Sequence, residues 1–156
     1  MSWDAANLYL LVNITDPTPL NNGREGDRLW DGDGVELFIG SEKLDQPGTL
    51  LYSDRQVLLG GQAEVKPGSR HLVNAAKQPD IKLVNVPSVD GSGYTMEAAI
   101  PWSALDITPK ENLELIFDLA IDDASQGGGR TRQLMWNGGS RNSGDRSYWG
   151  RLQLVP

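Results

Sequence analysis

The chain contains no cysteine and only one histidine among its 156 residues. Without cysteine it can form neither a disulfide nor a zinc–thiolate site, and thiolate catalysis is excluded. His71 is not accompanied by the Gly-x-Ser-x-Gly motif of a nucleophile elbow, so the sequence does not indicate a serine triad. A cysteine-free composition suits a secreted bacterial protein as well as a cytosolic one.

The sequence also lacks basic clusters and long apolar runs. Its net charge is −7, whereas binding to nucleic acid requires a cationic surface that releases counterions. No apolar run approaches the roughly 20 residues that a membrane-spanning helix needs. Residues 1–4 do not begin a signal-peptide pattern, so a signal is absent from this sequence. We therefore expect neither nucleic acid nor a membrane as a partner.

Short apolar runs separated by glycine and proline turns make up most of the chain. A chain of this length suits one domain, residues 1–156, with a sizeable core. Only residues 101–105 suggest a helical turn, because proline is tolerated at the start of a helix. The remaining runs predict an all-β fold, an antiparallel β-sandwich of the jelly-roll or immunoglobulin-like kind. Its expected strands are residues 7–14, 34–40, 49–52, 56–59, 70–75, 81–86, 94–100, 113–121, 132–136 and 148–155.

An aromatic residue stands beside carboxylates around residue 30. Trp30 precedes Asp33, and the strand that follows carries Glu36. The C–H face of a sugar ring stacks on an indole while its hydroxyls bond to carboxylate oxygens. These three residues are therefore candidates for contact with a saccharide. Strand alternation puts Glu36 on one face with Phe38, so its carboxylate either bonds a ligand or pairs with an internal arginine.

Aspartates gather at the ends of the expected strands. Asp16, Asp31, Asp122 and Asp123 are the candidate ligands of a structural calcium ion, because this cation prefers carboxylate and carbonyl oxygens. The segment around Asp31 does not fit an EF-hand, which needs a further oxygen ligand and a glutamate at its twelfth position. Capping of turns by these side chains is the alternative role.

Haem binding and glycoside hydrolysis have little support in the sequence. Met96, Met135 and His71 are the candidate haem ligands, but each methionine stands among apolar strand residues. That position indicates core packing, and no haem is expected. Hydrolysis needs two carboxylates that flank one glycosidic bond, and no pattern brings Glu36 and Glu97 together. We expect a protein that is not an enzyme.

Five segments follow one another in an order found in a known family. They are Trp3-Asp4 with Asn7 to Leu10 and Asp16; Trp30 with Asp33 to Ile39; Gly93-Tyr94 with Glu97 to Trp102; Phe117-Asp118 with Asp122-Asp123; and Trp136 with Trp149 to Leu154. In this order the chain resembles family 9 carbohydrate-binding modules. The resemblance implies a secreted bacterial β-sandwich that binds cellulose, xylan or their oligosaccharides, often at chain ends. It also implies attachment to a xylanase or another glycoside hydrolase.

The resemblance carries two site residues directly. In family members two tryptophans clamp a sugar and a glutamate bonds to its hydroxyls; Trp30 and Glu36 match the first tryptophan and the glutamate. The second tryptophan should fall near Ser143, where this chain has none. The glutamine and the arginine of the family fall at Ala120 and Leu58. The resemblance therefore implies a site with half of the clamp.

The loop before the last expected strand offers replacements for the missing clamp residue. Arg141, Asn142 and Tyr148, with Arg146 beside them, are candidates for carbohydrate contact. An arginine stacks flat and donates a fork of hydrogen bonds. Because the clamp is reduced, a structural or protein-interaction sandwich without sugar binding is the main alternative function.

The resemblance also bears on the edge of the expected sheet. Similar modules usually carry one or two strands ahead of the Trp3-Asp4 segment, whereas this sequence starts inside that segment. A missing strand would leave the backbone donors and acceptors of its neighbour unpaired, and such an edge pairs with another chain. We therefore expect an edge-strand homodimer.

Overall fold

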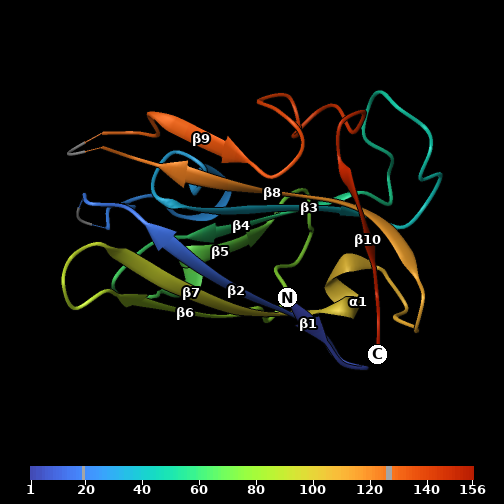
Figure 1. The fold of residues 1–156 in the computed structure, drawn as a ribbon, viewed down its shortest axis with the longest axis horizontal. Helices are drawn as coiled ribbons and strands as arrows, with labels where there is room; N and C mark the ends of the chain where they lie inside the picture. The colour runs from blue at the N-terminus through green and yellow to red at the C-terminus, as the bar shows by residue number, and fades with distance from the viewer. Residues whose placement is uncertain (19, 126–127) are drawn as a thin grey trace.

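The computed structural model describes residues 1–18, 20–125 and 128–156. Within these ranges the chain is all-β, with one four-residue α-helix and two short 3₁₀ helices (Figure 1). The elements are β1 (Ser2–Trp3), β2 (Asn7–Thr15), η1 (Gly26–Arg28), β3 (Gly34–Gly40), β4 (Arg55–Gly60), η2 (Pro67–Ser69), β5 (Arg70–Leu72), β6 (Lys82–Pro87), β7 (Gly93–Pro101), α1 (Trp102–Leu105), β8 (Glu114–Asp123), β9 (Arg132–Met135) and β10 (Gly150–Gln153).

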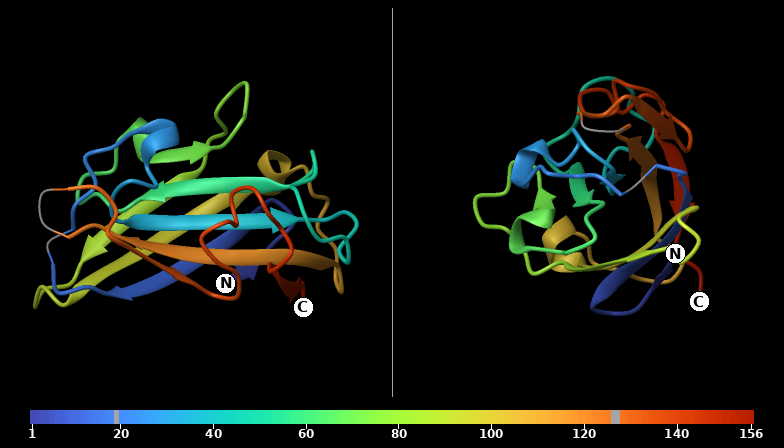
Figure 2. Two further views of the ribbon diagram at one scale, coloured as in Figure 1. Left: turned by 90° about the horizontal axis from the view of Figure 1, so that it is seen from above. Right: turned by 90° about the vertical axis from the view of Figure 1, so that its left-hand side faces the viewer.

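Two antiparallel sheets face each other, and the predicted β-sandwich is confirmed (Figure 2). The smaller sheet has the strand order β1-β2-β7-β6. The larger sheet has the order β10-β8-β3-β4-β5, and β9 also pairs with β8. Since β3 lies on one side of β8, β9 and β10 share its other side, one after the other along the strand. The two termini lie close together, and Trp3 Nε1 donates to the carbonyl of Val155 at 2.8 Å.

Most expected strands are confirmed within a few residues of their bounds, but two segments differ. The strand predicted at residues 49–52 is wrong, because Thr49 makes only an isolated bridge to Asp145. Asp54 accepts the backbone N–H of Leu51 at 2.7 Å, which closes a turn there. The sequence does not predict β1, because two residues are too few to display an alternation. The helical turn expected at residues 101–105 is confirmed as α1.

The main hydrophobic core lies between the two sheets. β3 contributes Val35, Leu37 and Ile39, and β7 contributes Met96 and Ile100 from the facing sheet. All five side chains are buried. Each such side chain contributes about 1.5–3 kcal/mol to folding when it leaves water. This core makes the six-stranded sheet a firm base for whatever lies on its other face.

The outer face of the six-stranded sheet carries a second, smaller apolar cluster. Phe38 belongs to this cluster, which confirms the alternation expected in β3. The ring of Trp149 packs against Phe38 with the ring centroids 5.6 Å apart. As a result every residue of β3 is buried, although one face of the strand points away from the main core. The buried members of the cluster are Phe38, Ile116, Ala120 and Trp149.

The outer edge of β2 is only partly covered. β7 pairs with β2 along its whole length, whereas β1 pairs only with Leu8 and Tyr9. In the described part of the chain no strand pairs with this edge beyond Tyr9. These contacts do not test the expected edge-strand homodimer, which stays a prediction. None of the described helices is both long and apolar enough to cross a bilayer.

Candidate binding site

A cavity of about 380 Å³ lies on the outer face of the six-stranded sheet, beside the second apolar cluster. This volume is in the range of sites that hold small molecules. Strands β3 and β4 contribute its central residues. The others come from η1 and the turn after it, the segment after β5, the segment after β8, β9 and the loop after β9. The lining residues are Asp27, Trp30, Glu36, Phe38, Gln56, Leu58, Val73, Arg130, Gln133, Gly139, Ser140, Asn142 and Ser143.

Glu36 is the hub of a hydrogen-bond network in this cavity. Its Oε1 accepts hydrogen bonds from Arg130 Nη1 at 2.9 Å and from Gln133 Nε2 at 2.9 Å. Its Oε2 accepts a hydrogen bond from Gln56 Nε2 at 2.5 Å. The sequence left open whether Glu36 pairs with an internal arginine, and the structure identifies Arg130 as that partner. The carboxylate is thereby held in place with its charge compensated.

Asp122 lies next to Glu36 and shares both of its partners. Asp122 Oδ1 accepts from Arg130 Nη1 at 2.8 Å and from Gln133 Nε2 at 3.0 Å. The pKa of Asp122 is raised to about 8, chiefly by burial and then by the neighbouring Glu36 carboxylate, while Arg130 opposes the shift. A carboxyl group that keeps its proton near neutral pH can donate a hydrogen bond. One arginine thus balances two buried acidic groups under the cavity.

Trp30 stands at the cavity and is 37% exposed. The preceding residue, Leu29, is buried, and the turn at Arg28 and Asp31 is closed by a backbone hydrogen bond of 2.9 Å. The guanidinium carbons of Arg130 and Arg28 lie 5.1 and 5.8 Å from the centre of the indole. Such cation–π contacts orient the ring. Trp30 is therefore a partly exposed aromatic surface held next to a polar network.

The loop after β9 is anchored onto the sheet by Asp118. This buried carboxylate accepts hydrogen bonds from the backbone N–H of Asn137 and of Gly138, and from Asn142 Nδ2 at 2.6 Å. A Cβ atom at Gly138 would collide with Asn142 and Asp118, so only glycine permits this close approach. The anchoring places Asn142 and Ser143 at the cavity.

The other predicted carbohydrate ligands lie outside the cavity. Asp33 is fully buried and accepts backbone N–H groups of Ala124 and Asn21, so it has no access to this surface. Arg141 and Tyr148 are exposed but do not line the cavity. Arg146 is buried and pairs with Asp54 at 3.4 Å, which joins two loops. Of the predicted set, the structure brings together Trp30, Glu36 and Asn142.

The positions that resemblance assigned to missing family residues do meet at this site. Leu58 and Ala120 lie directly opposite Glu36 on its two neighbouring strands. Ser143, near which the second tryptophan was expected, lines the cavity. Leu58 and Ala120 thus place apolar side chains next to Glu36, where the resemblance implies an arginine and a glutamine. Gln56 and Gln133 supply polar groups there instead.

The remaining tryptophans have structural positions. Trp102 and Trp149 are buried. Trp136 is 58% exposed, and its ring packs edge-on against Phe117 at 5.7 Å between centroids. Trp136 does not line the cavity, so it offers a comparison residue for Trp30.

Three aspartates form a second acidic group away from the cavity. Asp16, Asp33 and Asp123 each offer a carboxylate oxygen, and these oxygens lie within 4.8 Å of one another. Burial raises the pKa of Asp33, and the carboxylates of Asp16 and Asp123 contribute to that shift. Two of the four aspartates predicted to bind calcium, Asp16 and Asp123, are in this group. The other two, Asp31 and Asp122, lie instead with Arg24 and Arg130.

Tyr94 provides a separate observation beside this acidic group. Its hydroxyl is buried and has no hydrogen-bond partner. The pKa of Tyr94 is raised, first by burial and then by the charges of Asp33 and Asp16. Carboxylate oxygens are donors that calcium prefers, so Asp16, Asp33 and Asp123 fit such an ion.

Sequence reasoning missed the three residues that donate hydrogen bonds to Glu36. Gln56 shares a strand face with Leu58, so strand alternation could have found it. Gln133 on β9 lies opposite Asp122 on β8, but that pairing cannot be seen in the sequence. Arg130 precedes β9 and is 94 residues from Glu36, and no local pattern marks it. These contacts arise only when β3, β8 and β9 come together.

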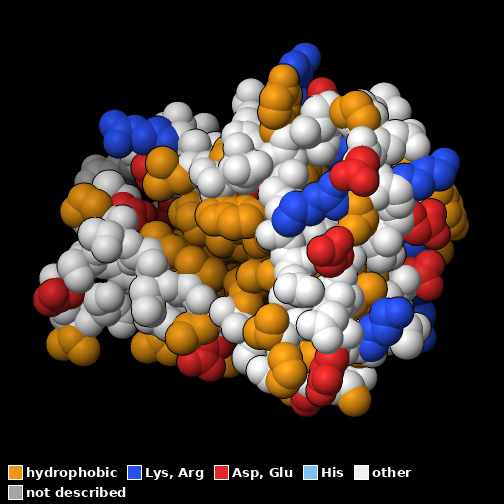
Figure 3. All heavy atoms as spheres, turned by 45° about the vertical axis from the view of Figure 1, so that its right-hand side comes forward, with side chains coloured by type: hydrophobic (Ala, Val, Ile, Leu, Met, Phe, Trp, Pro, Cys, Tyr) orange, Lys and Arg blue, Asp and Glu red, His pale blue; other side chains and the backbone are white. Residues whose placement is uncertain are grey.

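The surface charge agrees with the composition. Figure 3 shows one face on which Lys and Arg side chains are interspersed with Asp and Glu side chains, next to a hollow where apolar side chains gather. No basic patch of the kind that neutralises phosphates is seen on this face.

The whole chain, residues 1–156, matches the family described as "Carbohydrate family 9 binding domain-like". It is 32% identical over 155 residues to endo-1,4-beta-xylanase A of Thermotoga neapolitana, and 31% identical over 156 residues to exoglucanase XynX of Acetivibrio thermocellus. These alignments cover 98% and 99% of this chain but only 13% of each relative. The chain thus spans about one eighth of the length of these curated relatives.

Two solved structures share its architecture. Both are carbohydrate binding modules of family 9 from Caldicellulosiruptor kristjanssonii, one in complex with cellotriose and one in complex with glucose. Their TM-scores to this chain are 0.74 and 0.75, each at 20% sequence identity. The matches cover 98% and 97% of this chain, and 71% and 72% of those chains. At this identity the likeness establishes the fold.

Proposed function

Because the chain belongs to carbohydrate-binding family 9, we propose that it binds cellulose, xylan or their oligosaccharides without catalysing a reaction. The observation that carries the proposal is the cavity beside Trp30, with its partly exposed indole and its polar lining. A sugar ring would stack its C–H face on the indole. Its hydroxyls would bond to the oxygens of Glu36 and to the amides of Gln56 and Gln133.

The fixed network under the cavity supports this proposal. Glu36 is held by three donors and keeps further acceptor positions on its two oxygens. A ligand hydroxyl therefore meets a group that needs no reorganisation. Arg28, which also approaches the indole, has a side chain that is 62% exposed. A sugar would displace a solvated side chain there, at little cost.

The relatives suggest a context for this binding. The endo-1,4-beta-xylanases and the exoglucanase are about eight times longer than the aligned segment. We infer that the module is attached to a bacterial glycoside hydrolase, holds it on plant polysaccharide, and acts outside the cell. The catalytic residues would belong to another part of such an enzyme.

Isothermal titration calorimetry with cellobiose, cellotriose and xylotriose tests the proposed binding. We expect affinities from the millimolar to the high micromolar range, roughly −4 to −6 kcal/mol, because each hydrogen bond contributes a net of about 1 kcal/mol. Tryptophan fluorescence should change on titration. Maltotriose, which has the same three glucose units as cellotriose in a different linkage, is the control. No heat and no fluorescence change with any glycan would instead favour a structural or protein-interaction role.

We also propose a structural calcium ion at Asp16, Asp33 and Asp123. The proposal rests on the three converging carboxylates, of which that of Asp33 is fully buried. Such an ion would join the segment after β2, the start of β3 and the end of β8. It would offset the repulsion among carboxylates that are partly or fully buried.

Thermal unfolding with calcium and with a chelator tests this ion. An ion present at a hundred times its Kd stabilises by about 2.7 kcal/mol, which corresponds to a Tm increase of roughly 5–10 °C for a chain of this size. Asp123→Asn should abolish the calcium effect. Asp80→Asn changes an exposed aspartate that pairs with Lys82, and should leave the calcium effect intact. Equal Tm values with calcium and with chelator in the wild type would contradict the proposal.

A further inference from the structure

A second cavity of about 750 Å³ adjoins the cavity beside Trp30. The two cavities share Gln56, Val73 and Ser143 in their linings. They are therefore two sections of one groove, which runs from Gln56 on the outer face of β4 past the segment after β5 to the end of β4 near α1. The second section continues past Arg55 and Asn74 to Tyr52. The first section alone has the volume of a small-molecule site, so a small ligand would not need the second section.

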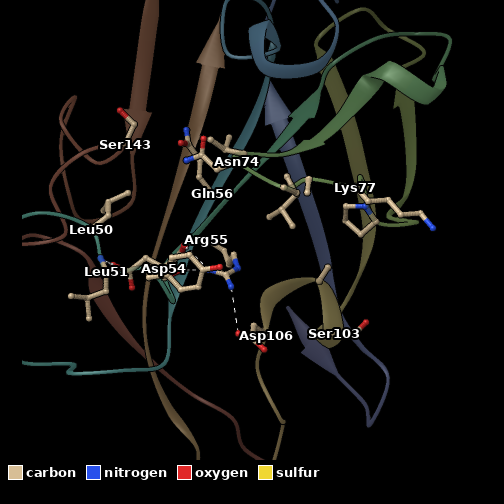
Figure 4. Close-up of a pocket in the computed structure, with 17 residues that line it drawn as sticks. Leu50, Leu51, Asp54, Arg55, Gln56, Asn74, Lys77, Ser103, Asp106 and Ser143 are labelled. Atoms are coloured by element: carbon tan, nitrogen blue, oxygen red, sulfur yellow. Dashed lines mark hydrogen bonds and ion pairs between the residues drawn. The ribbon is translucent and has the colours of Figure 1, made fainter.

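Figure 4 shows how the second section is built. Arg55 and Gln56 lie between Leu50 and Ser143 on one side and Lys77 and Ser103 on the other. The wall with Leu50 and Ser143 is made of two loops that are joined by the bridge between Thr49 and Asp145. The opposite wall includes α1 and Asp106, which pairs with Arg55 at 3.5 Å. The bridge thus joins the two loops of the first wall, and the ion pair joins the opposite wall to β4.

The small side chain of Ser143 leaves the junction between the two sections open. This small residue is exposed and lines both of them. It stands where the family resemblance leads one to expect an aromatic clamp residue. A tryptophan at this position would fill the junction and close the first section. With serine, a ligand that starts at Trp30 has a way onward.

The far section carries groups suited to further sugar units. Tyr52 is 97% exposed, and the guanidinium carbon of Arg55 lies 6.0 Å from its ring centre. A phenol ring in this position offers a second stacking surface. Gln56 and the exposed Asn74 offer amide donors and acceptors between the two aromatic residues.

From this groove we propose that the module binds a polysaccharide along its chain rather than at its end. The proposal rests on the function proposed above and specifies the ligand of the same site. One sugar unit lies at Trp30, and the chain runs past Ser143 so that later units reach Tyr52. Affinity then grows with the number of units that the groove holds, and a free chain end is not required.

Titration calorimetry with the intact chain tests this arrangement through the ratio of two affinities. We expect cellohexaose to bind roughly tenfold more tightly than cellobiose, because it gains a second stacking contact and further hydrogen bonds. Tyr52→Ala should bring that ratio down to about one while cellobiose still binds, because Tyr52 lines only the second section. Ser143→Trp, which fills the junction, should also bring the ratio down to about one. Leu11→Ala changes a large exposed residue on the other sheet, and should leave the ratio unchanged.

Reduction of the terminal sugar with borohydride provides an independent readout. Reduced cellohexaose should bind as well as the native hexaose, since the groove does not recognise the end. A tenfold loss on reduction, or a wild-type ratio near one, would overturn the proposal while binding at Trp30 stands. If the wild type binds no glycan at all, both the groove and the proposed function fall. Circular dichroism checks that each variant is folded.

Discussion

Replacing Arg130 with methionine should lower the free energy of unfolding by about 3–5 kcal/mol at pH 9, because it leaves buried acidic groups without their cation. Arg130 Nη1 lies 2.9 Å from Glu36 and 2.8 Å from Asp122, whose side chains are 4% and 1% exposed. Breaking a buried ion pair by removing one partner costs far more than removing a pair on the surface. Urea denaturation of the wild type and the variant measures the difference.

The loss should be much smaller at pH 5. The pKa of Asp122 is about 8 in the folded protein, against 3.8 for the free side chain. A raised pKa means that the stabilising contribution of this group is complete below about pH 4 and is lost as the pH rises through about 8. At pH 5 the folded protein holds Asp122 protonated, and only Glu36 needs Arg130. At pH 9 both groups carry charge.

Arg151→Met is the matched control for this experiment. Arg151 pairs with Asp45, whose side chain is fully exposed. Surface pairs of this kind contribute about 0–1 kcal/mol, so this variant should change stability little at either pH. Equal losses for Arg130→Met at pH 5 and pH 9 would show that the arginine does not serve to balance these two acids.

Replacing Trp30 with alanine should reduce the affinity for cello-oligosaccharides tenfold or more, which corresponds to about 1.4 kcal/mol. The indole supplies the only stacking surface among the residues that line the first cavity apart from buried Phe38. Its loss removes a contact that hydrogen bonds, which exchange with water, do not replace. Titration calorimetry and ligand-detected NMR measure the affinity.

Two variants separate stacking from general effects on the fold. Trp136→Ala removes a tryptophan that is 58% exposed and lies outside the cavity, and it should bind normally. Trp30→Phe keeps a smaller ring and should retain part of the affinity. The fluorescence change on titration should disappear in Trp30→Ala and persist in Trp136→Ala. Unaltered binding by Trp30→Ala would remove this residue from the site.

The sequence predicted the fold well because strand formation has a local signature. A period of two and the turn residues between runs located most strands, and the alternation in β3 put Glu36 and Phe38 on one face, as the structure confirms. The same reasoning failed at residues 49–52, where an apolar run follows a turn but, among the described residues, meets another segment only through an isolated bridge. A strand needs a partner, and the partner is not in the local sequence.

The candidate site was predictable only in part. Trp30 and Glu36 stand close together in the chain, so their chemistry could be seen from the sequence. Asp33 looked equivalent to them, yet it points into the fold and bonds to Asn21 and Ala124. A difference of a few residues along an irregular segment decides whether a side chain faces solvent, and no periodicity describes such a segment.

The acidic groups illustrate the same division between local and distant information. Their composition indicated a cation site near the strand ends, but four candidates could be sorted only by their neighbours. Asp16 and Asp123 meet Asp33, whereas Asp122 meets Arg130. Whether an aspartate faces another carboxylate or a guanidinium depends on how the strands pair.

The amino-acid order alone was enough for the strand pattern and the aromatic–acidic motif, because each depends on residues within one short segment. The partners of Glu36 and the open junction at Ser143 came from the folded chain. Arg130 and Gln133 are 94 and 97 residues from Glu36, and Ser143 is farther still. Contacts over such separations are set by sheet pairing and loop anchoring, and these exist only once the two sheets have packed around their common core.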